Sequence, residues 1–410
     1  MLQLRMVADT ANIVMESWYN VKKRWFLLGT CIWVMLTGCG NVEQEATEAR
    51  EPATNIETAV SVAELEVTQA PSLTEFPSPT QEPTATPIPG AYDFTVCFAG
   101  DISLAEGAVT TQRMDASENG IYDCISAELM DYMNQADIFC LNNEFTYSLR
   151  GEPLAGKAYT FRANPERVAV LGQMGVDVVS LANNHVYDYG EDALLDTLDI
   201  LAEADISYFG AGTNLEEAMK PIYKEVDGKT IAFVGASRAE KNKMTPQAGE
   251  DTPGILRCYD TELFRQVIKE ADANADFVLA YVHWGTEYSH ELEDVQLQTG
   301  KEYLDAGADV IIGAHSHCLQ GMEYYDGKPI IYSLGNYWFN KRTLDTMLLM
   351  LHFQGNDVEE QLEVKVIPAM QAEQQTRIVE DSQERERIFS FLEKISVNVE
   401  INEVGVVTSQ

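Results

Sequence analysis

Two histidines, one residue apart, follow a short apolar run in the last third of the chain. Residues 310–313 read Val-Ile-Ile-Gly, and His315 and His317 come shortly after them. The whole chain has only six histidines, and imidazole is the commonest metal ligand among side chains. In an extended segment both rings would point to the same side and could reach one metal cluster. A buried strand that happens to end in polar residues is the alternative, and this stretch alone leaves both interpretations open.

Metal-competent or hydrogen-bonding side chains also end most of the other apolar runs. They are Asp101, Asn142 and Glu144, Asn183 to His185, His283 and Asn336. In open α/β folds the functional crevice lies at the carboxyl ends of the strands. Carboxylate, amide and imidazole groups that converge there would form the mixed ligand set that suits Zn, Mn or Fe. His290 and His352 lie outside this pattern, and we interpret both as structural or solvated.

Each of these strand ends has a plainer interpretation when it is taken alone. Asp101 after Gly100 fits a turn, residues 142–144 fit a helix cap, and His283 fits a core histidine with one hydrogen bond. Residues 183–185 are harder to explain in this way, because two amides and an imidazole are costly at a strand end without partners. The metal interpretation therefore rests on several strand ends together.

The elements that must position these residues alternate between strands and helices. Short apolar runs predict buried strands at 94–101, 137–144, 176–185, 230–237, 276–285, 309–317 and 329–336. Amphipathic segments between them, such as 191–205 and 261–272, have the apolar spacing of helices. This alternation predicts an α/β fold. Residues from about 346 onward predict further strands and a helix around 383–395 that complete the same domain.

The first 39 residues have the features of an export signal. The basic residues 22–24 precede the apolar run 25–36, which is too short for a comfortable membrane span. Residues 36–39 read Leu-Thr-Gly-Cys, which resembles a bacterial lipoprotein signal. We therefore expect residues 1–38 to be a signal peptide and Cys39 to be lipidated. An ordinary signal peptide or a short anchor helix is the alternative.

A segment of different composition follows the signal. Residues 39–90 are rich in Glu, Thr and Pro and end in TEFPSPTQEPTATPIPG. Few aromatic residues and closely spaced prolines predict a disordered, extended tether. It would display a folded domain, expected at residues 91–400, away from the membrane surface.

Charge and cysteine content exclude some classes of partner and fold. The chain has 28 Lys and Arg against 65 Asp and Glu. Such acidity argues against nucleic acid as a partner, because nucleic-acid binding needs a basic face. The five cysteines after Cys39 are odd in number and widely spaced, so we expect no disulfide framework.

An ordered set of motifs carries a family resemblance. The motifs are AGDISL, LNNEFTYS, SLANNHVYDYG, VHWGTEY, GADVIIGAHSHCLQG and YSLGNYWF. In this order they resemble the CapA-type capsule-synthesis (poly-γ-glutamate) family, which looks like a branch of the calcineurin-like metallophosphoesterases. The resemblance runs from about Tyr92 to Pro368. It implies a metallophosphatase-like two-sheet sandwich flanked by helices (α/β/β/α). Together with the lipoprotein-like signal, it indicates an extracytoplasmic, lipid-anchored bacterial protein.

The same resemblance implies a site for two divalent metal ions (Mn, Zn or Fe). The implied ligands are Asp101 and His317 for one ion, Asn184, His283 and His315 for the other, and Glu144 as the bridging carboxylate. His185 would be the general acid that protonates the leaving oxygen, and Asp188 would orient it. Two such ions would acidify a bridging water and neutralise charge on a phosphoryl transition state.

The sequence departs from the family pattern at positions that bear on activity. Ser103 stands where metallophosphoesterases usually have a histidine, so the shell of the first metal is thinner than in a standard phosphoesterase. Three functions stay open: a metal-dependent hydrolase of a phosphoester or polymer bond, a non-catalytic assembly or export factor, and a scaffold without metal.

The resemblance also implies partners. They are an anionic capsule polymer or a phosphoester substrate, and the capsule synthesis machinery. The lipoprotein-like signal adds the membrane as a partner, through the lipid anchor. Because the chain is so acidic, direct binding of an anionic polymer would need the metals or a local basic patch. Arg162, Lys341 and Arg342 are the candidates for such a patch.

Overall fold

Two β-sheets form the centre of the described part of the chain. The structure is a computed structural model that describes residues 90–241 and 243–410. The predicted signal peptide, Cys39 and the predicted tether up to residue 89 lie outside these residues. Among the helices that the structure describes, none has both the length and the apolar character needed to cross a bilayer.

The larger sheet has ten strands and is built outward from β1 (Tyr92–Ile102). On one side, β2 (Ile138–Asn143), β5 (Val178–Ser180) and β6 (Ser207–Phe209) follow in parallel. On the other side, the antiparallel strands are β16 (Leu344–Gly355), β17 (Glu360–Ala372), β20 (Val406–Ser409) and β19 (Val399–Ile401). β15 (Asn336–Trp338) pairs with the end of β1, and β18 (Gln375–Ile378) pairs with β17. The carboxyl ends of β1, β2 and β5 therefore lie at one edge.

The second sheet has six strands with a parallel centre. The parallel strands are β9 (Lys229–Ser237), β11 (Phe277–Trp284), β12 (Val310–His315) and β14 (Lys328–Leu334). β8 (Ile222–Val226) and β13 (Leu319–Tyr325) are its antiparallel edges. Two short pairs lie outside the sheets, β3 (Thr146–Tyr147) with β4 (Arg162–Ala163) and β7 (Ala211–Gly212) with β10 (Gly254–Ile255).

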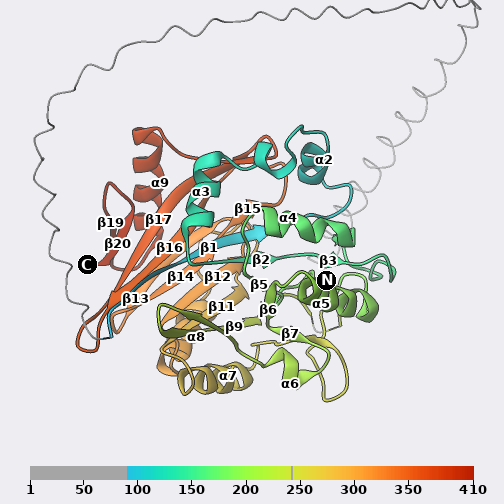
Figure 1. The fold of residues 1–410 in the computed structure, drawn as a ribbon, viewed down its shortest axis with the longest axis horizontal. Helices are drawn as coiled ribbons and strands as arrows, with labels where there is room; N and C mark the ends of the chain where they lie inside the picture. Colours follow the sequence, from blue (N-terminus) through green and yellow to red (C-terminus); the bar gives the residue numbers. More distant parts are fainter. Residues whose placement is uncertain (1–89, 242) are drawn as a thin grey trace, which may run out of the picture. The chain divides into compact units, whose positions relative to one another are not determined.

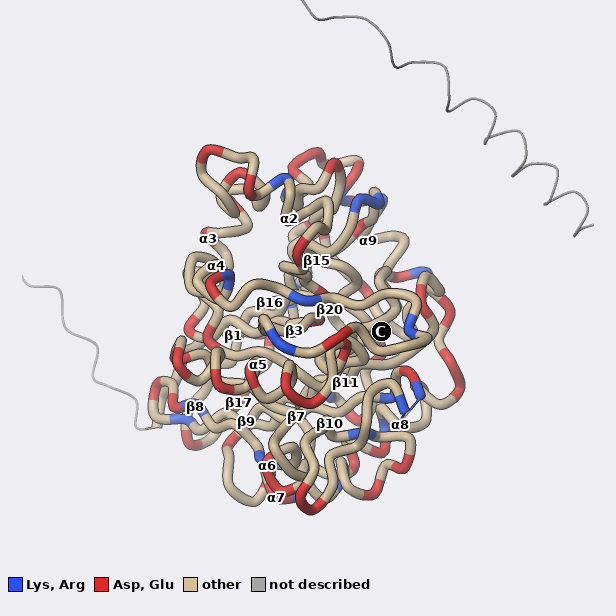
Figure 2. The backbone as a smooth tube through the Cα atoms, turned by 90° about the vertical axis from the view of Figure 1, so that its right-hand side faces the viewer, with Lys and Arg blue, Asp and Glu red and all other residues tan. Residues whose placement is uncertain are grey.

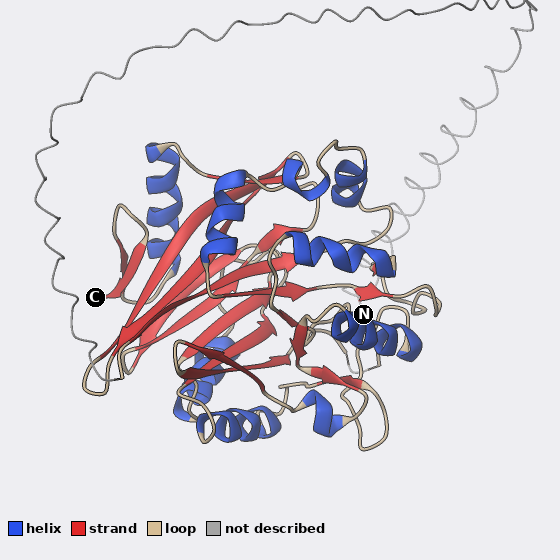
Figure 3. Ribbon diagram, in the orientation of Figure 1, coloured by secondary structure: helices blue, strands red, loops and turns tan. Residues whose placement is uncertain are grey.

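Helices cover the outer faces of both sheets (Figures 1 and 3). The larger sheet is covered by α2 (Val109–Asp115), η1 (Gly120–Asp123), α3 (Ala127–Gln135), η2 (Pro165–Arg167), α4 (Val168–Gln173) and α5 (Glu191–Glu203). The smaller sheet is covered by α6 (Leu215–Ala218), α7 (Glu262–Asp272) and α8 (Asp294–Asp305), and α9 (Ser382–Ile395) packs at the side of the sandwich.

The two faces of each central strand belong to different cores. Val96 and Phe98 of β1 pack between the sheets with Phe233 and Tyr281, whereas Cys97 faces the helical layer. Because successive side chains of a strand point to opposite faces, an apolar residue is needed at every position of such a strand. This explains the continuous apolar runs of the sequence, and the predicted α/β/β/α sandwich is confirmed.

The predicted elements differ from the structure mainly at their ends. The apolar run 176–185 contains only the short strand β5, because the Asn183 side chain accepts hydrogen bonds from the backbone N–H groups of His185 and Val186 (both 3.0 Å). A side chain that binds its own backbone in this way replaces the ladder of the sheet with a turn. The chain also stays in the larger sheet beyond residue 400, through β20.

Gly313 shows how closely the strands approach behind the predicted site. A Cβ atom there would lie 1.9 Å from the Tyr332 carbonyl oxygen and 2.7 Å from Trp284 Nε1. The Trp284 indole donates to that same oxygen (2.9 Å) across Gly313. Only a residue without a side chain therefore fits between β14 and Trp284 at this point.

We expect Gly313→Ala to lower the free energy of unfolding by about 2 kcal/mol or more, since backbone atoms cannot yield to the added methyl group. Gly172→Ala is the matched control: Gly172 lies in α4 with no atom within 4 Å of the added Cβ. This control is expected to raise the free energy of unfolding by roughly 0.5–1 kcal/mol. Urea denaturation measures both, and equal midpoints for the two variants would contradict the prediction.

Candidate metal centre

The predicted site residues lie together where the carboxyl ends of strands from both sheets meet. Asp101 is in the last residues of β1, and Glu144 follows β2. His283 lies near the end of β11, and His315 ends β12. The remaining predicted residues, Asn184, His185, Asp188 and His317, come from the turns after β5 and β12. All of them are buried, with no side chain more than 7% exposed.

Glu144 is the meeting point of the two predicted ligand groups. Glu144, His283 and His315 have ligand atoms within 4.8 Å of one another, and so do Asp101, Glu144 and His317. Glu144 Oε1 lies 3.6 Å from His283 Nε2 and 3.9 Å from His317 Nε2. The division between the groups is the one that the family resemblance implies.

The amide of Asn184 joins the group that contains His283. Asn184 Oδ1 lies 2.7 Å from His283 Nε2. The rings of His283 and His315 have centroids 4.6 Å apart. Asn184 thus lies beside the group of Glu144, His283 and His315.

Asn142 holds the two carboxylates apart at the centre of the site. Its Nδ2 donates to Asp101 Oδ1 (2.7 Å) and to Glu144 Oε2 (3.3 Å). Its Oδ1 accepts from Asn183 Nδ2 (3.0 Å), which fixes the orientation of the amide. In the sequence, Asn142 stands out only as a polar residue at a strand end, because its spacing does not distinguish a hydrogen-bond donor from a metal ligand.

The electrostatics of the second group fit a divalent cation. Burial, and then the Asp101 carboxylate, raise the pKa of Glu144 well above its usual value, so the surrounding protein groups disfavour its charged form. Burial lowers the pKa of His283 and lowers that of His315 to about 3, which keeps both rings neutral. Among the described residues, Glu144 Oε1 and His315 Nδ1 are buried without a hydrogen-bond partner. Neutral imidazoles beside a carboxyl group that lacks a compensating cation are a donor set for Zn, Mn or Fe.

Asp101 and His317 form a second buried pair. Burial opposes the ionisation of Asp101, but the hydrogen bond and charge of His317 outweigh it and lower the pKa of the carboxyl. Burial likewise opposes protonation of His317, yet Asp101 raises its pKa. The contact runs from His317 Nδ1 to Asp101 Oδ2 (3.1 Å), while Asn336 Oδ1 accepts from the same nitrogen at 2.8 Å. Nε2 of His317 therefore faces Glu144.

His185 stands beside both groups and belongs to neither. Its Nδ1 lies 2.7 Å from Asp188 Oδ2, and its Nε2 points to Glu144 Oε1 at 3.9 Å. Desolvation lowers the pKa of His185, and the Asp188 carboxylate opposes this shift. Phe161 packs against the ring with a centroid distance of 4.4 Å. The ring is thus held so that one nitrogen faces the carboxylate and the other faces the centre.

The two histidines of the 315–317 segment do not converge by strand alternation. β12 ends at His315, whose φ is +92°, and His317 has φ +55°. Positive φ is uncommon for residues other than glycine and is typical of functional sites that the surrounding structure holds in place. The ring centroids are 6.0 Å apart, so each ring reaches a different ligand group. Both rings therefore lie at the site, but through a turn and not through the extended segment that we expected.

An aromatic rim that the sequence did not reveal surrounds the site. Phe339 packs on His317 (4.7 Å between centroids), and Tyr288 lies 5.6 Å from the same ring. The Arg342 guanidinium stacks over Tyr288 at 3.9 Å from the ring centroid. One of the three predicted basic-patch residues thus borders the centre. Elsewhere, acidic residues are spread along the fold (Figure 2).

The other two basic-patch residues and Ser103 have different surroundings. Arg162 donates to the backbone oxygens of Arg150 and Gly151 (both 3.1 Å), so its charge is partly used within the fold. Lys341 is exposed. Ser103 is buried, and its Oγ accepts from Ala105 N (3.4 Å). It adds no imidazole to the group of Asp101.

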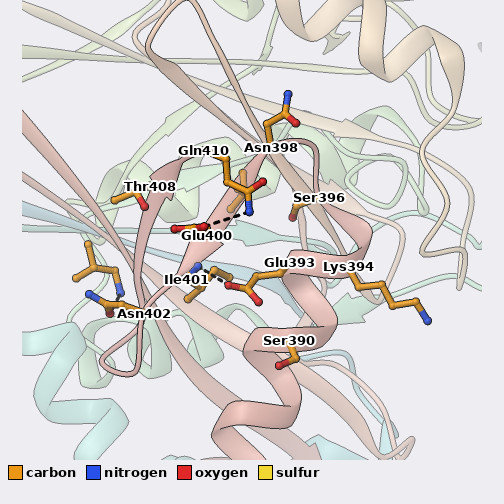
Figure 4. A pocket seen from close by; sticks show the side chains of 12 residues that line it. Ser390, Glu393, Lys394, Ser396, Asn398, Glu400, Ile401, Asn402, Thr408 and Gln410 are labelled. Carbon is orange, nitrogen blue, oxygen red and sulfur yellow. Dashed lines mark hydrogen bonds between the residues drawn. The ribbon is translucent and has the colours of Figure 1, made fainter.

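A separate polar hollow lies between α9 and the β19–β20 hairpin (Figure 4). Glu393 accepts from the backbone N–H of Ile401 (2.7 Å), and Gln410 donates to Glu400 (3.4 Å). Its polar groups thus bind one another and the backbone. None of the predicted site residues lines this hollow, and we assign it a structural role.

A protein-family model matches the part of the chain that contains the site. The family model described as "Bacterial capsule synthesis protein PGA_cap" matches residues 95–341, more than half of the chain. This range contains all the predicted metal ligands, His185 and Asp188.

Curated relatives carry related names. The PGA biosynthesis protein CapA of Bacillus subtilis (strain 168) is 39% identical over 218 residues, which are 52% of this chain and 56% of that protein. The capsule biosynthesis protein CapA of Bacillus anthracis is 31% identical over 281 residues, which are 66% and 67% of the two chains. The chain thus spans little more than half of the length of the first relative. Among solved structures, the NAD nucleotidase of Haemophilus influenzae matches with 14% identity and a TM-score of 0.41, over 75% of this chain and 64% of that one.

Proposed function

Because the chain belongs to the bacterial capsule synthesis protein family, we propose that it acts in the synthesis of a capsule polymer of the poly-γ-glutamate type through a two-metal hydrolytic site. The observation that carries the hydrolytic part is the pair of ligand groups that share Glu144, beside a histidine that belongs to neither. Such an arrangement suits the cleavage of a phosphoester or of a bond in an anionic polymer.

The proposed metal sites use residues that already face one another. Asp101, Glu144 and His317 would hold one divalent ion. The other would be held by the same carboxylate with His283, His315 and the amide oxygen of Asn184. When bound, ions of the Mn, Zn or Fe type supply positive charge for an anionic substrate and activate water.

His185 would carry the proton that the leaving oxygen needs. Asp188 accepts from Nδ1, which leaves Nε2 as the atom that holds and releases a proton on the side of the centre. The lowered pKa of His185 makes the neutral ring its resting form and the protonated ring a ready proton donor. The adjacent Asp188 carboxylate stabilises the imidazolium when it forms. Phe161 and Phe339, which meet edge to face at 5.3 Å, would limit the access of water to this side of the site.

The cellular setting is part of the proposal. Lipidation at Cys39 would anchor the chain to the outer side of the cell membrane, and residues 40–90 would tether the domain at a distance from it. In this position the protein would act with the capsule synthesis machinery on an anionic polymer or a phosphoester. Arg342, stacked on Tyr288 beside His317, would offset part of the acidity of the chain near the substrate.

A non-catalytic role in polymer assembly or export is the second candidate. It is favoured by Ser103, which stands at the position of a usual metal ligand and binds a backbone N–H instead. With fewer ligands the ion of the Asp101 group would be held weakly, and the cleft would then bind polymer without cleaving it.

Complementation of a capsule-forming strain that lacks this protein tests the proposal. The full chain should restore surface polymer, and Asp101→Ala should leave it at the level of the deletion strain because one metal group loses its carboxylate. Cys39→Ser should release the protein from the membrane fraction into the medium. Full restoration by Asp101→Ala would contradict the hydrolytic site and favour the assembly role.

A further inference from the structure

A buried lysine lies behind the proposed proton carrier. Lys157 belongs to the segment between β3 and β4, and its side chain is only 4% exposed. Its Nζ lies 2.6 Å from Asp188 Oδ1 and 2.7 Å from Glu240 Oε2, and it also donates to the backbone oxygen of Asn184. Lysine is almost never buried unless it is paired. Here the ammonium forms ion pairs with two carboxylates and donates a hydrogen bond to one backbone oxygen.

Asp188, the carboxylate that pairs with Lys157, connects the segment between β3 and β4 to His185. Asp188 Oδ2 accepts from the Phe161 backbone N–H (2.6 Å) and contacts His185 Nδ1 (2.7 Å). The backbone oxygen of Asp188 accepts from the Leu154 N–H (2.9 Å). One fully buried carboxyl therefore serves several donors, and Lys157 is the cation that compensates its charge. Without a cation, a buried carboxylate is costly and tends to change its partners.

The same ammonium holds the backbone of a proposed metal ligand. The Asn184 carbonyl accepts from Lys157 and from Thr245 Oγ1 (2.9 Å). On the other side of the residue, Asn184 Oδ1 faces His283 Nε2 at 2.7 Å. A fixed carbonyl restricts the rotation of the Asn184 peptide, and hence the direction of its side-chain amide.

We infer that Lys157 is a positioning residue of this centre. One ammonium holds both the carboxylate that orients His185 and the peptide that aims Asn184 at the metal group. The part concerning Asn184 rests on the proposed metal site, whereas the part concerning His185 does not. Outer groups that orient metal ligands commonly change metal affinity by about 10- to 100-fold when they are removed.

The test uses the full chain labelled with ¹⁵N-histidine, in wild-type form and as Lys157→Met, which keeps the length of the side chain without its charge. In the wild type we expect an NMR signal of His185 with the proton on Nδ1, assigned by its loss in His185→Gln. Lys157→Met should lose or broaden that signal in metal-free protein. Its affinity for Mn²⁺ at one of the two sites, measured by calorimetry, should fall by about tenfold.

Lys328→Met is the matched control. Lys328 also pairs with a carboxylate, Asp309 (2.8 Å), and donates to a backbone oxygen, that of Ala308 (2.9 Å), at the far end of the second sheet. It should leave both the His185 signal and the Mn²⁺ affinity unchanged. If Lys157→Met does not fold, Lys157→Gln, which retains an N–H donor, takes its place with the same expectations.

The outcomes separate the inference from the proposed function. An unchanged His185 signal together with Mn²⁺ affinity within about twofold of the wild type would overturn the positioning role, leaving Lys157 only the support of its own loop. A wild-type chain that binds no Mn²⁺, Zn²⁺ or Fe²⁺ would refute the metal site. The His185 signal would still decide the role of Lys157 in that case.

Discussion

Glu144→Gln is expected to abolish binding of both metal ions. Within the described residues, Glu144 is the residue that the two ligand groups share, so one substitution removes an anionic donor from each group. An amide has nearly the same shape as a carboxyl group but no charge and a weaker affinity for divalent cations. The amide can still meet the Asn142 side chain, which now lies 3.3 Å from Glu144 Oε2, so the fold should be retained.

Elemental analysis of the purified full chain, supplied with Mn²⁺ and Zn²⁺, measures this effect directly. We expect about two ions per wild-type chain and far less than one per Glu144→Gln chain. Glu323→Gln is the matched control, because Glu323 is also buried but pairs with Lys301 (2.7 Å) and the Tyr332 hydroxyl (2.8 Å) away from the centre. Two tightly bound ions in Glu144→Gln would show that the shared carboxylate is not the bridge.

His185→Ala is expected to remove turnover and keep the metals. General acid catalysis by a positioned side chain typically contributes about 10²- to 10⁴-fold, so a loss in this range is expected for hydrolysis of a chromogenic phosphodiester such as bis(p-nitrophenyl) phosphate. His185 is in neither ligand group, and its Nε2 lies 3.9 Å from Glu144 Oε1. Metal content should therefore match the wild type.

Two comparisons make the His185 result decisive. His352→Ala should leave turnover unchanged, because His352 pairs with Asp93 (2.7 Å) at the surface of the larger sheet. Capsule restoration by His185→Ala, in a strain lacking the protein, would favour the assembly role even if the purified wild type hydrolyses the phosphodiester. Equal turnover of wild type and His185→Ala would remove His185 from the mechanism.

Much of the site was predictable because its residues have a common place in the local pattern. Asp101, Glu144, His283 and His315 each stand at or just after the end of an apolar run, and such ends converge in α/β sheets. The run lengths and the helical spacing between them are local properties, so they identified the strands and several helices. Composition and periodicity do not assign roles to these residues. The ordered motifs do, through the family resemblance, which implies the metal ligands and the general acid.

Other parts of the site have no local signature. Lys157 lies in a loop between two short strands, and its burial depends on Asp188 and Glu240, which come from different segments. Tyr288 reaches His317 from a turn with φ +57°, a conformation that a tyrosine adopts only when surrounding contacts impose it. The local sequence around Lys157 or Tyr288 does not distinguish either of them from an ordinary surface residue.

The amino-acid sequence by itself determined the alternation of buried strands and helices, the identity of the residues at the strand ends, and the family. Tertiary structure alone decided which of these ends come together around Glu144. Asp101 and His317 are 216 positions apart and meet only because β1 and β12 belong to sheets that pack face to face. Periodicity specifies which side of a strand is buried, but the register between two sheets depends on the packing of all the side chains between them.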